Sequence, residues 1–300
     1  MRRGAGRSFL PASLVVAVPF AWLGLFFLAP FAIVVAISFA EPTLAQPPFT
    51  PVIVWNDGWP RLDLHLTSYR LLVDDSLYIY AFANSVRIAL VSTLICLVIG
   101  YPMALAISRA PEAARFPLLM LVVLPFWTSF LIRVYAWMGL LGLNGPINGL
   151  LVGLGAIDEP LALLHNDFAI HLGIVYSYLP FMVLPIYVAL VRIDPALVEA
   201  AGDLGCRPAT AFRRVILPLS MPGVIAGSML VMIPAIGEFV IPDLLGGPDA
   251  VMIGKILWTE FFANRDWPAA AAIAVALLVL LVLPIIIFQR AEAREIGASR

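Results

Sequence analysis

The sequence predicts an all-α polytopic membrane protein with six transmembrane helices and one charged loop between the fourth and the fifth. Three observations predict this class. The chain of 300 residues is 62% hydrophobic and 12% charged, and its mean hydropathy of +0.99 is far above that of a soluble domain. Its apolar runs reach the ~20 residues that a helix needs to cross a bilayer. A single compact charged segment interrupts these runs in the second half of the chain.

The first apolar run extends from about Leu14 to Ile37 and follows Arg2, Arg3 and Arg7. It is longer than the ~7–15 residues of a cleaved signal core, which favours a first membrane span. Between this span and the next, residues 41–81 form a long polar segment rich in proline. The six predicted spans are 14–38, 82–107, 117–141, 168–191, 220–242 and 267–289.

Basic residues set the orientation of these spans. With the N-terminus in the cytoplasm, 12 of the 18 Lys and Arg residues fall on the cytoplasmic side, and two lie within spans. Only Arg61, Arg70, Lys255 and Arg265 fall on the other side. This bias satisfies the positive-inside rule and places both termini inside. The predicted divisions are a cytoplasmic N-terminus (1–13), one transmembrane domain (14–290) with a periplasmic segment (41–81) and a cytoplasmic loop (193–218), and a cytoplasmic C-terminus (291–300).

The charged loop is predicted to form two short helices at the membrane surface. Asp194-Pro195 is typical of a helix start, and Gly205 stands where a glycine ends a helix. A second helix is expected to begin at Pro208 and to end before Pro218. The first helix, about 15 Å long, is long enough to seat in a groove of a soluble partner. A solvated amphipathic linker with arginines facing lipid headgroups is the alternative.

The motif in this loop resembles the EAA signature of the permeases of ABC importers. It consists of Glu-Ala-Ala, a glycine four places after the second alanine, and a hydrophobic-x-Leu-Pro ending at Pro218. In that family the loop is the coupling helix, which docks into a cleft of the cytoplasmic ATPase. The resemblance therefore implies that the loop couples the chain to an ATPase through Glu199, Ala200, Ala201, Gly205, Leu217 and Pro218.

Longer stretches look like the spermidine/putrescine permease subfamily, among them "PFWTSFLIRVYAWMGLLG" (125–142) and "PAIGEFVIPDLLGG" (234–247). This likeness implies import of a polyamine by alternating access. It also implies four partners: an ATPase dimer, a second and different permease chain, a periplasmic binding protein and the lipid bilayer. Related importers share these stretches, so an amino-acid-like or anionic solute is the alternative. A net charge of −1 gives no indication of nucleic-acid binding.

The sequence offers no pattern for catalysis, a metal or a cofactor. It contains no G-x-x-x-x-G-K-[ST], so the chain is not expected to bind ATP through a P-loop or to act as an enzyme. The three histidines and two cysteines show no metal-ligand spacing. A membrane-embedded enzyme and a gradient-driven secondary transporter are the rival classes. The second would be expected to show internal repeats, and none is visible.

Glu238 is the first candidate for the solute path. It lies in span five between Pro234 and Pro242, directly after Gly237, where a broken helix is expected. An acid within a span costs roughly 2.5–3.5 kcal/mol, so it usually faces a pathway or a partner charge. Proximity to the outer interface, where Glu238 would reach water, is the alternative. Asp243, five residues later, is a second and more exposed candidate.

Arg133 in span three has three interpretations. It snorkels to the interface, it neutralises Glu238, or it contacts an anionic group of the solute. Four aromatic residues lie beside it, and they either belong to the interfacial belt or offer a ring face to an amine: Phe126, Trp127, Tyr135 and Trp137. Arg87, near the start of span two, is expected to snorkel.

Overall fold

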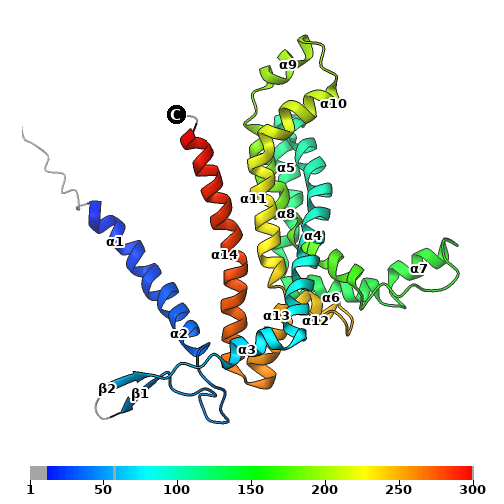
Figure 1. The fold of residues 1–300 in the computed structure, drawn as a ribbon. Coiled ribbons are helices and arrows are strands. Elements are labelled where there is room, and N and C mark those ends of the chain that lie inside the picture. The colour runs from blue at the N-terminus through cyan, green and yellow to red at the C-terminus, as the bar shows by residue number, and fades with distance from the viewer. Residues whose placement is uncertain (1–11, 57–58, 299–300) are drawn as a thin grey trace, which may run out of the picture. The chain divides into compact units, whose positions relative to one another are not determined.

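The computed structural model describes residues 12–56 and 59–298, which are mostly helical as predicted (Figure 1). By its contacts the chain divides into two compact units, Leu77–Ile256 on one side and Met1–Ser76 with Leu257–Arg300 on the other. Most of the predicted N-terminal segment 1–13, and the last two residues of 291–300, lie outside the described residues. The single transmembrane domain over 14–290 stays a prediction.

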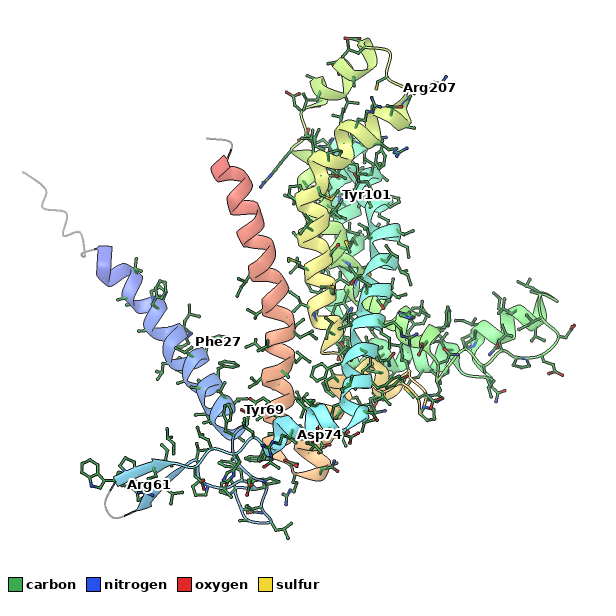
Figure 2. All side chains as sticks on the ribbon, in the orientation of Figure 1. Phe27, Arg61, Tyr69, Asp74, Tyr101 and Arg207 are labelled. Carbon is green, nitrogen blue, oxygen red and sulfur yellow. The ribbon has the colours of Figure 1, made fainter. Side chains whose placement is uncertain are left out.

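The unit made of the two chain ends combines apolar helices with a small hairpin. Helix α2 contacts α14, and α3 contacts α14 as well. A hydrogen bond of 2.7 Å joins the hydroxyls of Ser38, just after α2, and Tyr69 of α3 (Figure 2). The elements of this unit are α1 (Ala12–Leu23), a π-helical turn (Gly24–Leu28), α2 (Ala29–Ile37), β1 (Ile53–Asn56), β2 (Trp59–Leu62), α3 (Thr67–Asp74), a π-helical turn (Thr259–Asn264) and α14 (Trp267–Ala298).

The antiparallel β1–β2 hairpin and α3 occupy the segment 41–81 that was predicted only as polar and rich in proline. The hairpin pairs Ile53 with Leu62 and Trp55 with Pro60. β-branched and aromatic residues before an Asp-Gly pair, a sequence typical of hairpin turns, explain why this stretch pairs with itself.

The unit Leu77–Ile256 holds the other helices. In chain order they are α4 (Ser76–Arg109), α5 (Glu112–Val123), a 3₁₀ turn (Leu124–Trp127), α6 (Phe130–Leu141), α7 (Pro146–Gly153), α8 (Asp167–Val191), α9 (Pro195–Asp203), α10 (Pro208–Ala211), a π-helical turn (Phe212–Ile216), α11 (Leu217–Ile236), α12 (Val240–Leu244) and α13 (Ile253–Trp258).

Five helical segments in the described part of the chain are long and apolar enough to cross a membrane: Val16–Ile37, Ser76–Arg109, Phe130–Gly153, Asp167–Val191 and Pro208–Ile236. The sixth predicted span lies within α14 (Trp267–Ala298), which is apolar over Trp267–Val282. The described residues thus give five candidate spans, and the third lies at Phe130–Gly153 rather than at the predicted 117–141.

Two boundaries differ from the prediction for local reasons. The span expected over 117–141 breaks between α5 and α6, because Pro125 lacks an N–H group and Thr128 is extended. The second helix of the charged loop does not end before Pro218, because α10, the π-helical turn and α11 follow one another without interruption. The π-helical turn directly before Leu217 accommodates Pro218, which has no N–H group to donate within the run.

Helices α4, α8 and α11 lie side by side and share one apolar core (Figure 1). Met182, Val183 and Ile186 of α8 are completely buried in it. Glycines on the neighbouring helices permit this packing. A Cβ atom at Gly223 of α11 would lie 2.6 Å from Ala189 Cβ and 2.7 Å from the Pro185 carbonyl oxygen. Small residues that bring two backbones together are typical of helix pairs in membranes.

Replacing Gly223 by Val is therefore expected to push α8 and α11 apart and to lower the unfolding temperature of the detergent-solubilised chain. Gly139→Val in α6 is the matched control, because a Cβ atom at Gly139 meets nothing within 4 Å. Thermal unfolding followed by size-exclusion chromatography measures both variants. Equal losses at the two positions would contradict the close-packing argument.

Candidate functional site

A cavity of about 440 Å³, open to the surface of the unit Leu77–Ile256, lies where two helices break. The break between α5 and α6 supplies one wall, the middle of α8 a second, and the end of α11 a third. The polar groups on these walls belong to Arg133, Ser177, Tyr178 and Glu238. The cavity therefore joins the two charged span residues predicted from the sequence.

Glu238 stands in the break that the sequence predicts between Pro234 and Pro242. Helix α11 ends at Ile236, and α12 begins at Val240. The carboxylate is buried, with 7% of the residue exposed, and its Oε1 atom accepts hydrogen bonds from the N–H groups of the next three residues at 3.2, 3.0 and 3.4 Å. Its Oε2 atom accepts a hydrogen bond from the hydroxyl of Tyr178. The carboxylate thus satisfies the free backbone donors of the broken helix.

Arg133 lies on the opposite wall of the cavity and is 8% exposed. Its guanidinium carbon is 5.3 Å from the ring centroid of Phe126 and 5.8 Å from that of Phe130. Its Nε and Nη1 atoms are buried and have no hydrogen-bond partner. The described residues show no ion pair between Arg133 and Glu238, so direct neutralisation is absent in this structure.

Three other predicted path residues do not line this cavity. Trp127 and Tyr135 are 75% and 57% exposed, and Asp243 forms an ion pair of 3.2 Å with Lys255. Their roles in the path stay predictions. Arg87 was expected to snorkel, but it donates hydrogen bonds to Asp167 at 2.7 Å and to the Asn84 side chain at 2.9 Å.

Sequence reasoning missed Tyr178 and Phe130, whereas Phe126 was among the aromatic residues considered beside Arg133. One signal for Tyr178 was present: its hydroxyl group lies in the middle of an apolar span, where it needs a partner. Phe130 carried no such signal, because its side chain has no polar group.

The second candidate site is the charged loop. Helix α9 begins as predicted, because Asp194 Oδ1 accepts a hydrogen bond of 3.0 Å from the N–H group of Ala196. It ends in a Schellman motif, in which Cys206 N–H donates to the Ala201 carbonyl at 3.0 Å and Gly205 N–H to the Gly202 carbonyl at 2.8 Å. Both ends of this short helix are fixed by local hydrogen bonds.

Gly205 has a φ of +76° in this motif, as its predicted place at the helix end requires. Beyond it, the loop carries Arg207 to the tip between α9 and α10 (Figure 2). Glu199 is exposed, and so are the apolar side chains of Leu197 and Leu204, at 49% and 89%. The loop therefore presents a rigid helix with apolar and acidic side chains free for contact.

Spanning helices around a cavity that holds two charged side chains, together with an exposed helix in a charged loop, are the features of a membrane transport subunit. Comparison with known proteins gives the family. A profile described as "Binding-protein-dependent transport system inner membrane component" matches residues 8–296. The chain belongs to this family of ABC importer permeases.

Individual relatives agree with this assignment. The chain is 40% identical over 279 residues to the "Spermidine/putrescine transport system permease protein PotB" of Haemophilus influenzae, covering 93% of each chain. It is 38% identical to the protein of the same description from Escherichia coli, covering 90% of this chain and 94% of that one.

Solved structures share the fold at lower identity. A bacterial ABC transporter "involved in the import of the acidic polysaccharide alginate" contains a chain with a TM-score of 0.68 and 17% identity, covering 95% of both chains. A chain of the MetNI methionine ABC transporter has a TM-score of 0.51 and 21% identity, covering 75% of this chain and 96% of that one.

Proposed function

We propose that this chain moves a polyamine such as spermidine or putrescine from the periplasm to the cytoplasm of a bacterium. The observation that carries this proposal is the 40% identity over 93% of the chain to a spermidine/putrescine permease. The buried carboxylate of Glu238 in a cavity between spanning helices agrees with a path for a cation.

The proposed complex contains a second permease chain, two copies of a cytoplasmic ATPase and a periplasmic binding protein. This chain contributes no ATP site, and hydrolysis takes place on the partner ATPase. Helix α9 is the proposed coupling helix, with Glu199, Ala200, Ala201 and Gly205 at the contact. Leu217 and Pro218 begin the helix that continues from the loop into the membrane. ATPase closure would move this loop and switch the permease pair between inward-open and outward-open states.

Two acids are proposed to pass the amine inward. Asp243 is half exposed and its present partner is Lys255, so an incoming ammonium group competes for the carboxylate at this step. Glu238 follows, and an ammonium group there replaces the hydroxyl of Tyr178 at Oε2. Both positions hold the amine weakly, which a path requires because a deep well would stop release. Trp127 and Tyr135 remain proposed contacts for the alkyl chain, although they lie outside the cavity.

The experiment that tests the substrate is uptake of radiolabelled putrescine and spermidine. The full transporter is expressed in a host that lacks polyamine uptake, and ATP is depleted in a parallel sample. ATP-dependent uptake of either compound supports the proposal. Uptake that persists without ATP and stops with an uncoupler would indicate a secondary transporter instead.

An amino-acid-like or anionic solute is the second candidate, and one observation favours it. The unpaired guanidinium of Arg133 in the cavity offers hydrogen-bond donors rather than acceptors. Thermal stabilisation of the binding protein against amines, amino acids and organic acids separates the two candidates.

The proposed orientation places both termini and the charged loop in the cytoplasm. The native Cys206 is partly exposed and is expected to react with a membrane-impermeant maleimide only from the cytoplasmic side. In a Cys206→Ser background, Pro60→Cys and Asp249→Cys are expected to react only from the periplasmic side. Labelling of intact cells and of inverted vesicles measures this. Reaction from the opposite side at any of the three positions would overturn the span order.

A further inference from the structure

Arg133 is a buried cation without a hydrogen-bond partner at two of its nitrogen atoms. The residue is 8% exposed, and Nε and Nη1 are enclosed and unpaired. Phe126 and Phe130 lie within 5.3 and 5.8 Å of the guanidinium carbon, measured to their ring centroids. Aromatic faces attract the positive charge but do not satisfy N–H donors in the way an oxygen does. The contacts in the chain therefore hold the guanidinium in place and leave its donors available.

The acid that lines the same cavity as Arg133 accepts hydrogen bonds from other groups. Glu238 lines the same cavity, but Oε1 accepts three backbone N–H groups and Oε2 accepts the Tyr178 hydroxyl. Turning this carboxylate toward Arg133 would leave the backbone donors of the broken helix buried and unsatisfied, which is costly. The ion pairs of the described residues join other side chains and do not include Arg133.

A buried charge that lacks a partner destabilises the chain that carries it, whereas the same charge contributes favourably once a well-placed counter-ion arrives. The cavity of about 440 Å³ is many times the ~30 Å³ that one water occupies, so it has room for a larger polar group. A planar guanidinium can donate two parallel hydrogen bonds to the paired oxygens of a carboxylate. We propose that the cavity holds a carboxylate from outside this chain, bound by the guanidinium of Arg133.

The carboxylate has two sources, and the choice rests on the proposed function. A side chain of the second permease subunit fits the polyamine proposal, because it cancels the positive charge that a cationic solute would otherwise meet beside Glu238. A free carboxylate solute fits the alternative substrate class. Both sources use the same donors of Arg133.

The test compares two states of the same protein. In the isolated full-length chain in detergent, Arg133→Met removes an unpaired buried charge, so the unfolding temperature is expected to rise by several degrees. In the state that contains the carboxylate, the same substitution removes an ion pair, so the unfolding temperature is expected to fall. The expected result is thus a reversal of sign between the two states.

Arg87→Met is the matched control. Arg87 lies in a span too, but its partners Asn84 and Asp167 belong to this chain. This ion pair with Asp167 is about half exposed, so the Arg87 substitution is expected to lower the unfolding temperature only slightly, and by the same amount in both states. Arg133→Lys keeps the charge, so its unfolding temperature is expected to match that of the wild type in both states. Arg133→Gln takes the place of Arg133→Met if the Met variant does not accumulate.

Two arms identify the source without any polyamine present. If the assembled transporter loses stability on Arg133→Met in chloride buffer, the carboxylate belongs to the second permease. The other outcome is that Arg133→Met leaves the unfolding temperature of the assembled transporter unchanged in chloride buffer. If sodium glutamate or succinate at matched ionic strength then raises the unfolding temperature of the wild type and not that of the variant, the carboxylate is a free solute. The proposal is overturned if Arg133→Met changes the unfolding temperature by the same amount in the isolated chain, in the complex and in both salts. A failed polyamine uptake assay leaves this result unaffected.

Discussion

Glu238→Gln is expected to reduce polyamine uptake by about tenfold or more while assembly of the complex and basal ATPase activity stay close to wild type. The glutamine carbonyl oxygen can still accept the backbone N–H groups that Oε1 of Glu238 accepts at 3.0–3.4 Å, so the broken helix keeps its cap. The negative charge is lost, and a hydrogen bond between an ammonium and a carboxylate is worth ~1.5–3 kcal/mol, about ten- to a hundredfold in rate or binding. Uptake of radiolabelled putrescine and ATP hydrolysis in the same proteoliposomes measure both effects.

Two controls separate the charge from the cap. Glu238→Ala removes the acceptor as well as the charge and is expected to lower thermal stability in addition to uptake. Asp243→Asn removes a half-exposed acid that Lys255 already holds, so its effect on uptake is expected to be smaller. Transport by Glu238→Gln at the wild-type rate would show that the residue serves only to cap the broken helix.

Gly205→Ala is expected to reduce recovery of the ATPase with the permease by about tenfold, with membrane insertion intact. At a φ of +76° an added Cβ atom meets no neighbour within 4 Å, so the expected cost is backbone strain alone. That strain is about 1–2 kcal/mol for a residue with a side chain, and ~1.4 kcal/mol is a factor of ten in an equilibrium. Relief of the strain would open the Schellman motif and turn α9 away from its contact surface.

Gly202→Ala is the matched control, three residues earlier. A Cβ atom at Gly202 also meets nothing within 4 Å, but this residue lies inside α9 with an ordinary φ. The same substitution there is expected to support the helix and to leave ATPase recovery unchanged. Co-purification of a tagged permease with its ATPase measures both variants. Full ATPase recovery with Gly205→Ala and with the bulkier Gly205→Asp would remove this loop from the coupling mechanism.

The loop could be predicted closely because its determinants are local. Asp194, Pro195 and Gly205 act on hydrogen bonds within a few residues, so their spacing alone defines the two ends of α9. The break at Glu238 could be predicted for the same reason, since Gly237 and Pro242 restrict the backbone where they stand.

The cavity could be predicted only in part. The sequence marks Arg133 and Glu238 as costly residues in spans, and the structure places both on one cavity. The sequence alone does not show that Tyr178, rather than Arg133, contacts Glu238. Helices that are apolar on every face carry no stripe that shows which residues turn inward, so the choice between Tyr135 and Tyr178 depends on packing across the bundle. The hairpin in segment 41–81 was missed because its two strands are only four residues long and do not alternate between apolar and polar residues.

Helix α11 has a mechanical consequence. Its 20 residues, Leu217–Ile236, span about 30 Å at 1.5 Å per residue, from the end of the charged loop to the residue before Gly237. Pro222 and Pro234 interrupt its backbone hydrogen bonds, but the helix packs against α8 through Gly223 and Gly227, so it is expected to move as one body. A tilt of about 4° over that length moves the far end by about 2 Å, which is comparable to the length of a hydrogen bond. A small stroke at the proposed coupling loop would therefore be enough to break or make the contacts of Glu238.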